Sequence, residues 1–288
     1  MYTGREIAVF TDVHGLLEPL EAIITDIKRR GIKEIYSLGD NIGVGPNPRE
    51  VLELLEENHV LSINGNSEEY AILGTDPFIS YFTPQKQANR DWTHAQLTPG
   101  QIRNLQVCRH SYDLSVGGKK IALCHFINDV RMDYDAHSTW SYQAAVRYGS
   151  PNPTRQFHYT NSPEQQREVA RHAQSGSSYD RGFASAARDP LFGGKTIDQY
   201  DEIIQGHVHF RMLSKDKDTV IRTIRAAGMA YDPSEPNNMA SYIIIRERTD
   251  GYEIEEILVP FDRKKMEERI RNSTMPDNSE ITRFTTKR

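Results

Sequence analysis

Residues 7–14 read Ile-Ala-Val-Phe-Thr-Asp-Val-His, an apolar run that ends in an aspartate and a histidine. The first four of them, residues 7–10, are β-rich and predict a short buried strand. Leucine and isoleucine then recur at helical spacing over residues 17–27, and Gly31 predicts where this helix ends. A strand followed by a helix is the start of a βαβ unit, so the chain begins as an α/β fold.

The same alternation continues through the first third of the chain. Residues 35–38 and 60–63 predict a second and a third strand. Between them, Asn47 and Pro48 predict a helix start, with asparagine as the cap and proline at the first helical position. Strands that alternate with helices at this spacing indicate parallel pairing.

The remainder of the chain is richer in strands. Thr98 and Pro99 predict one more capped helix start, and residues 262–271 predict a charged surface helix. Two hairpins are expected, one around Gly117-Gly118 and one around Asp250-Gly251. The strands predicted in this part are residues 112–116, 119–124, 203–204, 220–224, 242–245 and 252–259.

Composition excludes several classes of function. The net charge of −5 gives no electrostatic reason to expect a nucleic-acid or anionic-membrane partner. No window approaches the ~20 apolar residues of a membrane span. Cys108 and Cys124 form no CxxC motif, which argues against a disulfide scaffold or a zinc ribbon and favours a reducing cytoplasm.

Five short polar motifs each follow a predicted strand. Loops at the carboxyl ends of strands in an α/β sheet converge on one crevice, which would bring two aspartates, one asparagine and four histidines together. Oxygen and imidazole ligands in this mixture suit Mn, Fe, Co, Ni or Zn. The motifs are Asp12-Val13-His14, Gly39-Asp40-Asn41, Gly65-Asn66-Ser67, His125 and Gly206-His207-Val208-His209.

Each motif alone also has a structural explanation. Asp40 and Asn66 could be helix caps or turn residues, since both residue types favour such positions. His125 alone could be a packed histidine, and the pair His207 and His209 could be a polar strand end. The metal hypothesis therefore rests on all five motifs occurring in order, each at a strand end.

The order D-x-H, G-D, G-N, H, G-H-x-H resembles that of the calcineurin-like metallophosphoesterases, and these motifs extend over residues 8–209. Residues 38–48 are similar to the bacterial phosphodiesterase branch. Val44 lies where the serine/threonine phosphatases and the symmetrical dinucleoside tetraphosphatases carry an arginine. The resemblance implies an α/β fold of four layers, an α/β/β/α sandwich of two mixed sheets flanked by helices.

The resemblance also implies two ion sites and a role for each ligand. Asp40 would bridge two divalent transition-metal ions (Mn, Fe, Ni or Zn, with manganese favoured), and a bridging hydroxide would be the nucleophile. Asp40 and Asn66 would be the residues at the reacting centre. The first ion would be held by Asp12, His14 and His209, and the second by Asn66, His125 and His207.

Two departures from the family pattern bear on catalysis. Ser67 lies where the usual G-N-H-[DE] motif has the histidine thought to protonate the leaving oxygen, and serine cannot be a general acid at pH 7. Candidates to replace that histidine are Glu68, His137 and His158. The second departure is the string at residues 226–229, Ala-Ala-Gly-Met, where the family has N-P-G-S.

We expect residues 1–265 to form a single metallophosphoesterase domain. Residues 126–200 are polar and too long for a simple loop, so they are interpreted as an insertion or cap near the active site, with a helix start at Ser162. Residues 266–288 are expected to be the end of a charged helix and a disordered tail.

The sequence thus predicts a phosphohydrolase that cleaves a phosphodiester or phosphoanhydride bond of a small substrate, possibly a nucleotide. Tyr134, Trp140 and Tyr142 in the insertion are candidates for a base-stacking wall. A phosphomonoesterase and a non-catalytic scaffold of the same fold are the alternatives. A nuclease is disfavoured by the acidic balance, and the sequence leaves the oligomeric state open.

Overall fold

The strand predicted at residues 7–10 is longer than expected and lies in the middle of a sheet. In the computed structural model, β1 (Tyr2–Phe10) pairs in parallel with β2 (Glu34–Ser37) and antiparallel with β9 (Met239–Arg248). The structure describes residues 2–73, 84–109, 111–125, 199–207, 209, 211–216, 218–229 and 238–276. Adding β3 (Leu61–Ser62) and β10 (Gly251–Pro260) gives a mixed sheet in the order β10-β9-β1-β2-β3.

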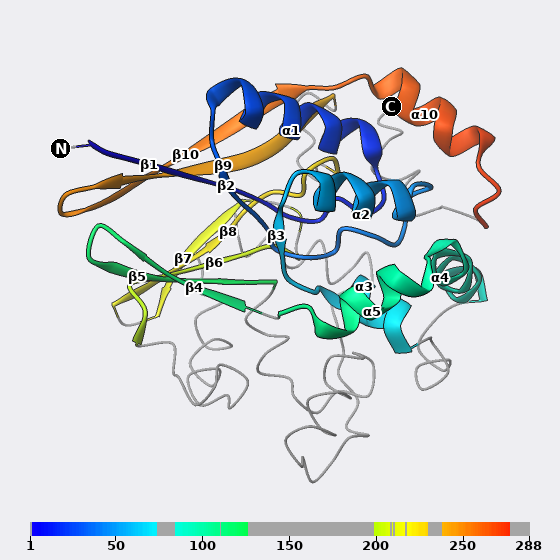
Figure 1. The fold of residues 1–288 in the computed structure, drawn as a ribbon, viewed down its shortest axis with the longest axis horizontal. Helices are drawn as coiled ribbons and strands as arrows, with labels where there is room; N and C mark the ends of the chain where they lie inside the picture. The colour runs from blue at the N-terminus through cyan, green and yellow to red at the C-terminus, as the bar shows by residue number, and fades with distance from the viewer. Residues whose placement is uncertain are drawn as a thin grey trace, which may run out of the picture.

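A second mixed sheet of five strands lies against the first (Figure 1). Its strands are ordered β4-β5-β6-β8-β7 and comprise β4 (Ser111–Val116), β5 (Lys119–Cys124), β6 (Glu202–Gln205), β7 (Met212–Asp216) and β8 (Thr219–Thr223). The hairpin of β4 and β5 and the parallel pairing of β5 with β6 bring both halves of the chain into one sheet. Strand β7 was not predicted, because its sequence, MLSKD, is largely polar.

Side-chain alternation along β1 divides the apolar residues between two cores. Ile7 and Val9 point between the sheets, where they join a cluster that includes Ile121, Leu123 and residues of both sheets. The alternate residues of β1, Ala8 and Phe10, join a cluster formed with the covering helices. This period of two fixes which face of the sheet is covered by helices.

Three helices share that second cluster with the first sheet, namely α1 (Leu17–Arg30), α2 (Pro48–Glu57) and α10 (Arg263–Asn272). Figure 1 shows them together on the outer side of the sheet. A smaller apolar cluster joins α3 (Asn66–Leu73) to α5 (Pro99–Val107), with α4 (Pro84–Gln96) packed against α3. Two mixed sheets flanked by helices confirm the predicted calcineurin-like α/β fold class.

The helix boundaries test the capping predictions one by one. Gly31 ends α1 in the left-handed conformation, with φ of 76°, as predicted. Thr98 forms a capping box with Gln101, which confirms the predicted start of α5. Asn47 holds the N-cap position of α2 and Pro48 opens the helix, as predicted, but the Asn47 side chain makes no capping hydrogen bond.

Several predictions concern residues outside the described ranges. They are residues 126–198 of the insertion predicted at 126–200, its helix start at Ser162, and the tail from residue 277 onward. The division into one domain with a cap therefore stays a prediction. Within the described ranges, no helix combines the length and apolar character that crossing a membrane requires.

Candidate metal centre

The five polar motifs follow the carboxyl ends of five strands, three in the first sheet and two in the second. Strands β1 and β2 run parallel, and so do β5 and β6, so within each pair the strands end at the same edge of a sheet. Asn66 is the first residue of α3, which follows β3. The structure thereby brings together the carboxylate and imidazole groups that the sequence singled out, in two groups of three: Asp12, His14 and His209, and Asp40, His125 and His207.

The first group has its ligand atoms within 4.8 Å of one another. The Asp12 carboxylate is fully buried, and its Oδ2 accepts hydrogen bonds from the Thr11 hydroxyl and the His207 backbone N–H, both at 2.8 Å. Its other oxygen, Oδ1, accepts no hydrogen bond from the residues that the structure describes. Instead, Oδ1 lies 3.4 Å from Nε2 of His209 and 3.7 Å from Nε2 of His14.

In the second group, a backbone carbonyl fixes the ring orientation of one histidine. Nδ1 of His125 lies 2.8 Å from the carbonyl oxygen of Leu38 and donates its proton to that oxygen. The lone pair is then on Nε2, which faces Oδ1 of Asn66 at 3.2 Å and Nδ1 of His207 at 3.1 Å. A carbonyl or carboxylate behind a histidine is the arrangement that orients an imidazole for metal binding.

Asp40 lies between the two groups. Its Oδ2 is 3.7 Å from Nε2 of His14 in the first group, and its Oδ1 is 3.6 Å from Nε2 of His125 in the second. The backbone N–H of Ser67 donates to Oδ1 at 2.8 Å, which holds the carboxylate in this orientation. One carboxylate thus presents an oxygen to each group.

Backbone strain concentrates at these residues. Seven residues other than glycine have φ in the left-handed region among the residues that the structure describes, and five of them are candidate ligands. Each such residue costs about 1–3 kcal/mol, and this strain clusters at functional sites. The five are Asp12, His14, Asp40, His207 and His209.

Charge and burial set the protonation of two ligands. Burial raises the pKa of the Asp12 carboxyl, but His209 and the other nearby histidines outweigh that effect and hold the pKa well below its usual value. Burial, together with the neighbouring His125, lowers the pKa of His207 well below that of free imidazole. An ionised carboxylate and a neutral imidazole are the forms in which these side chains bind metal ions.

The donor set therefore fits divalent ions. Asp12 Oδ1 is a buried oxygen that accepts no hydrogen bond within the described part of the chain, and a cation would satisfy it. Nε2 of His14 lies only 2.9 Å from Nε2 of His209, which places two imidazole nitrogens toward a common point. Mixed imidazole and carboxylate ligands of this kind suit borderline ions of the first transition row.

Glu68 has a different place from the one predicted. Its carboxylate is fully buried and accepts backbone N–H groups of Asp40, Asn41 and Gly65 at 2.7–2.8 Å, with Ile42 at 3.3 Å. Burial and the Asp40 charge raise its pKa to about 7. This geometry makes Glu68 a positioning residue that ties the loop after β2 to the start of α3, rather than a proton donor that touches the substrate.

The glycines of the motifs allow the loops to approach closely. A Cβ on Gly65 would lie 2.3 Å from Oδ1 of Asp40, and a Cβ on Gly45 would lie 2.2 Å from the carbonyl oxygen of His14. Sequence reasoning did not identify Gly45, Thr11 or the positioning role of Glu68. The available signal was the [DE] position of the G-N-H-[DE] pattern, which Glu68 occupies.

Of the other residues proposed from the sequence, some lie within the described ranges and some lie outside them. In residues 226–229, the backbone N–H of Ala227 donates to the carbonyl of Thr11 at 2.8 Å, so this string lies at the end of β1. Gly228 allows close contact, since a Cβ there would be 2.3 Å from Cγ of Pro19. The remaining candidates lie outside the described residues: His137, His158, Tyr134, Trp140 and Tyr142.

Comparison with known proteins agrees with this site. The calcineurin-like phosphoesterase family matches residues 5–211. The uncharacterized protein MJ0912 of Methanocaldococcus jannaschii is 36% identical over 119 residues, which are 41% of this chain and 48% of that protein. The chain thus spans about half the length of the curated relative it matches.

Two solved structures share the fold over nearly the whole chain. The hypothetical protein PH1004 from Pyrococcus horikoshii OT3 has a TM-score of 0.61 and 17% identity, with 97% of each chain covered. A metallophosphoesterase from Sphaerobacter thermophilus has a TM-score of 0.60 and 18% identity, with 98% of this chain and 99% of that chain covered. The two ligand groups present imidazole and carboxylate donors of the kinds that bind divalent metal ions. The chain belongs to the calcineurin-like phosphoesterase family.

Proposed function

We propose that this protein is a binuclear phosphohydrolase that cleaves a phosphodiester or phosphoanhydride bond of a small, nucleotide-like substrate. The observation that carries the proposal is the position of Asp40. Its two oxygens face His14 in one ligand group and His125 in the other, at 3.7 and 3.6 Å. A carboxylate shared in this way is expected where two ions lie side by side.

The proposal assigns one metal ion to each ligand group. When bound, a pair of divalent ions supplies a water of lowered pKa as nucleophile and positive charge for the phosphate. Among Mn, Fe, Ni and Zn we favour manganese, because the set mixes carboxylate and amide oxygens with imidazoles. Asp12, His14 and His209 would hold the first ion, Asn66, His125 and His207 the second, and Asp40 both.

The chain's own residues orient the ligands. The Thr11 hydroxyl and the His207 N–H hold one oxygen of Asp12, so the carboxylate can turn only its other oxygen to a ligand. The Leu38 carbonyl fixes the tautomer of His125. Such positioning interactions typically change metal affinity or activity by about 10- to 100-fold.

Ser67 favours substrates whose leaving group needs no proton. Ser67 is buried, and its backbone N–H donates to Oδ1 of Asp40. A Cβ added to Gly43 would lie 3.1 Å from the Cβ of Ser67. A hydroxyl cannot donate a proton at neutral pH as imidazole does, so anhydrides and aryl-like esters should react best. The absence of histidine at position 67 also favours the alternative of a non-catalytic scaffold, and a phosphomonoesterase is the other alternative. A complete set of ligands argues against the scaffold.

Partners and compartment follow from the same proposal. A small phosphorylated substrate fits a centre that supplies its own positive charge within an acidic chain. We expect neither membrane nor nucleic acid as a partner. Both Cys108 and Cys124 are thiols rather than disulfide partners, which is in keeping with our proposal of a cytoplasmic location.

Two measurements test the proposal together. Elemental analysis of protein purified without chelator should give well above one equivalent of transition metal per chain. The metal-supplemented protein should hydrolyse bis(p-nitrophenyl) phosphate or a dinucleoside polyphosphate faster than p-nitrophenyl phosphate. One equivalent or none after Mn²⁺ supplementation would count against two ions. Full metal content without hydrolysis of any of the three substrates would favour the scaffold.

A further inference from the structure

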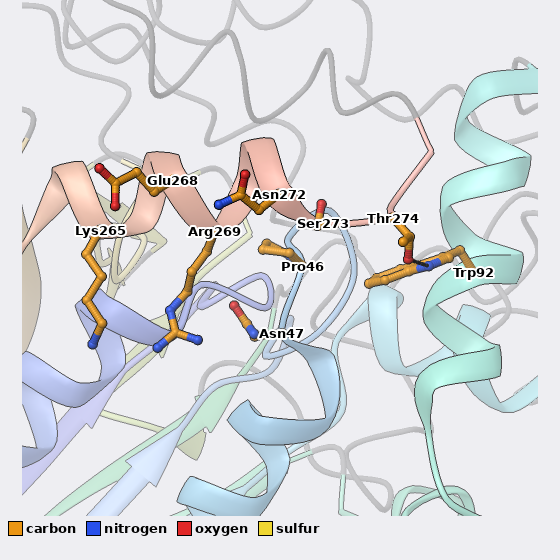
Figure 2. Close-up of a pocket in the computed structure, with 9 residues that line it drawn as sticks. All are labelled: Pro46, Asn47, Trp92, Lys265, Glu268, Arg269, Asn272, Ser273 and Thr274. Atoms are coloured by element: carbon orange, nitrogen blue, oxygen red, sulfur yellow. Dashed lines mark hydrogen bonds between the residues drawn. The ribbon is translucent and has the colours of Figure 1, made fainter.

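A separate pocket of about 600 Å³ lies between α10, α4 and the loop that precedes α2 (Figure 2). None of the seven candidate metal ligands is among its lining residues. Figure 2 shows Lys265 and Arg269 extending from α10 at one side of the view, Asn47 and Pro46 in the middle, and Trp92 on the far side. The pocket therefore offers cations at one end and an aromatic ring at the other.

Asn47 marks the middle of this pocket as a place for a hydrogen-bond donor. It holds the N-cap position of α2, yet its side chain makes no capping hydrogen bond. Its Oδ1 is buried without a donor among the described residues, and the residue is only 8% exposed. A buried acceptor without a partner costs about 1–3 kcal/mol, so a ligand hydroxyl or N–H at this position would be bound favourably.

The two cations of the pocket lie at its α10 end. Arg269 and Lys265 line it and are paired with Glu18 and Glu21 of α1, so a bound anion would share these cations with the two carboxylates. Glu268 also lines the pocket, but Figure 2 shows its carboxylate directed away from both cations. The N-terminus of α2 adds partial positive charge on the same side.

Trp92 provides the flat apolar surface at the opposite end. Its indole Nε1 donates to the Thr274 hydroxyl at 3.3 Å, which fixes the plane of the ring. Stacking of a nucleobase on an aromatic ring is worth about 1–3 kcal/mol and tolerates any base. The pocket thus has the cations Lys265 and Arg269 at one end, the buried acceptor of Asn47 in the middle and the ring of Trp92 at the other end.

We propose that this pocket binds a nucleoside monophosphate at a site separate from the metal centre. Lys265 and Arg269 would bind the phosphate, Oδ1 of Asn47 would accept from a ribose hydroxyl, and Trp92 would stack on the base. The order of these groups in Figure 2 matches the order of phosphate, ribose and base in the ligand. The inference does not depend on which reaction the metal centre catalyses.

Tryptophan fluorescence tests the site directly. The chain has two tryptophans, so a Trp140→Phe background leaves Trp92 as the reporter. Titration of the metal-loaded, full-length protein with AMP should change Trp92 emission to saturation, with calorimetry as an independent measure of binding. Adenosine alone and inorganic phosphate alone should each bind at least about 10-fold more weakly than AMP, because each lacks one end of the ligand.

Variants then locate the binding. Lys265→Gln and Asn47→Leu should each weaken AMP binding about 5- to 10-fold. Lys264→Gln is the matched control, because Lys264 is an exposed neighbour on α10 that does not line the pocket. If Asn47→Leu does not fold, the comparison of Lys265→Gln with Lys264→Gln decides alone. No saturable change of Trp92 emission, equal affinity in the two lysine variants, or phosphate that binds as tightly as AMP would overturn the proposal.

Discussion

The two ligand groups contain similar side chains, but the protein holds them in different ways. In the first group, Asp12, His14 and His209 all lie in the left-handed region of backbone conformation. In the second, Asp40 and His207 also lie in this region, whereas His125 directly follows a strand and Asn66 begins a helix, and neither of these two is in the left-handed region. The first group is therefore shaped by its loops alone, and the second is shaped partly by regular elements.

The difference extends to the supporting contacts. The Leu38 carbonyl and the Glu68 carboxylate hold the second group through hydrogen bonds to His125 and to the backbone around Asp40 and Gly65. The first group has hydrogen bonds to Asp12 from the Thr11 hydroxyl and the His207 backbone N–H, and adds close backbone packing of Gly45 against His14. Asp40 belongs to both arrangements, which makes it the residue whose loss should matter most.

The largest effect is expected for Asp40→Asn. An amide keeps the shape but presents only one oxygen and no charge, so it cannot serve two ions as a carboxylate does. We expect loss of at least one equivalent of metal and a drop in kcat/KM of about 10³-fold. Elemental analysis and phosphodiester hydrolysis measure both effects. Asp250→Asn, in the exposed turn before β10, is the control; activity within a few-fold of wild type in both variants would refute the shared role of Asp40.

Much of the fold and the candidate site could be predicted from sequence, because the signals were local. The hydrophobic period along β1 and the polar residues directly after it lie within eight residues of one another. Strand order along the chain then implied that the motifs converge. The assignment of ions to individual residues remains a prediction, since the structure gives only the positions of their side chains.

The features that sequence did not predict depend on contacts between distant segments. Glu68 was considered a proton donor because nothing local indicates that the loop after β2 folds over it. Asn47 has the residue type of a helix cap, but its side chain lies in a pocket formed with α10, more than 200 residues away in sequence. Strand β7 has no apolar pattern of its own and pairs with β8 through the backbone.

The second prediction concerns the pH dependence that the second group should confer. The pKa of Glu68 is raised from 4.5 to about 7, so the folded protein keeps a proton that the unfolded chain releases. The contribution of Glu68 to the free energy of unfolding should therefore fall by about 3 kcal/mol as the pH rises from about 4.5 to about 7, and stay constant above.

Comparison of wild type with Glu68→Gln isolates this effect, because His207 and Asp12 titrate alike in both proteins. Urea unfolding of the metal-free proteins between about pH 5 and about pH 8 gives the difference in unfolding free energy. We expect the wild type to lose stability relative to the variant as pH rises. A difference that is constant over this range would mean that Glu68 is ionised throughout.

The third prediction uses glycines to disturb one group at a time. Gly45→Ala should displace His14 and so cost the first ion, while Gly65→Ala should displace Asp40 and His125 and cost both. Each change should also destabilise the fold by about 2 kcal/mol through overpacking. Metal stoichiometry and thermal unfolding measure the two effects.

Gly100→Ala is the control for the glycine pair. This residue lies in α5, where the nearest atom to a new Cβ would be 3.7 Å away. It should stabilise the protein by about 0.5–1 kcal/mol and leave the metal content unchanged. Loss of the same number of ions in Gly45→Ala and Gly65→Ala would show that the two groups do not form independently.

The smallest effect is expected from Ser67→His, which restores the residue type that relatives carry beside the second group. Wild-type rates should depend steeply on leaving-group pKa, because no imidazole is present to protonate the leaving oxygen. The variant should accelerate alkyl phosphodiesters by about 10-fold, which is below the roughly 10²–10⁴-fold that a general acid typically contributes, because the position was not shaped for an imidazole. Aryl esters and anhydrides should change less.

The packing around Ser67 decides how this experiment is interpreted. Ser67 faces Gly43 on one side and Asp40 on the other, so an imidazole can extend only away from Gly43. Metal content must therefore be measured beside the rates, since a displaced Asp40 would slow every substrate alike. A selective gain on alkyl esters at unchanged metal content would place the missing proton donor at position 67. If the wild-type rates do not vary with leaving-group pKa while chemistry is rate-limiting, another residue already supplies the proton, and His137 and His158 are the next to replace.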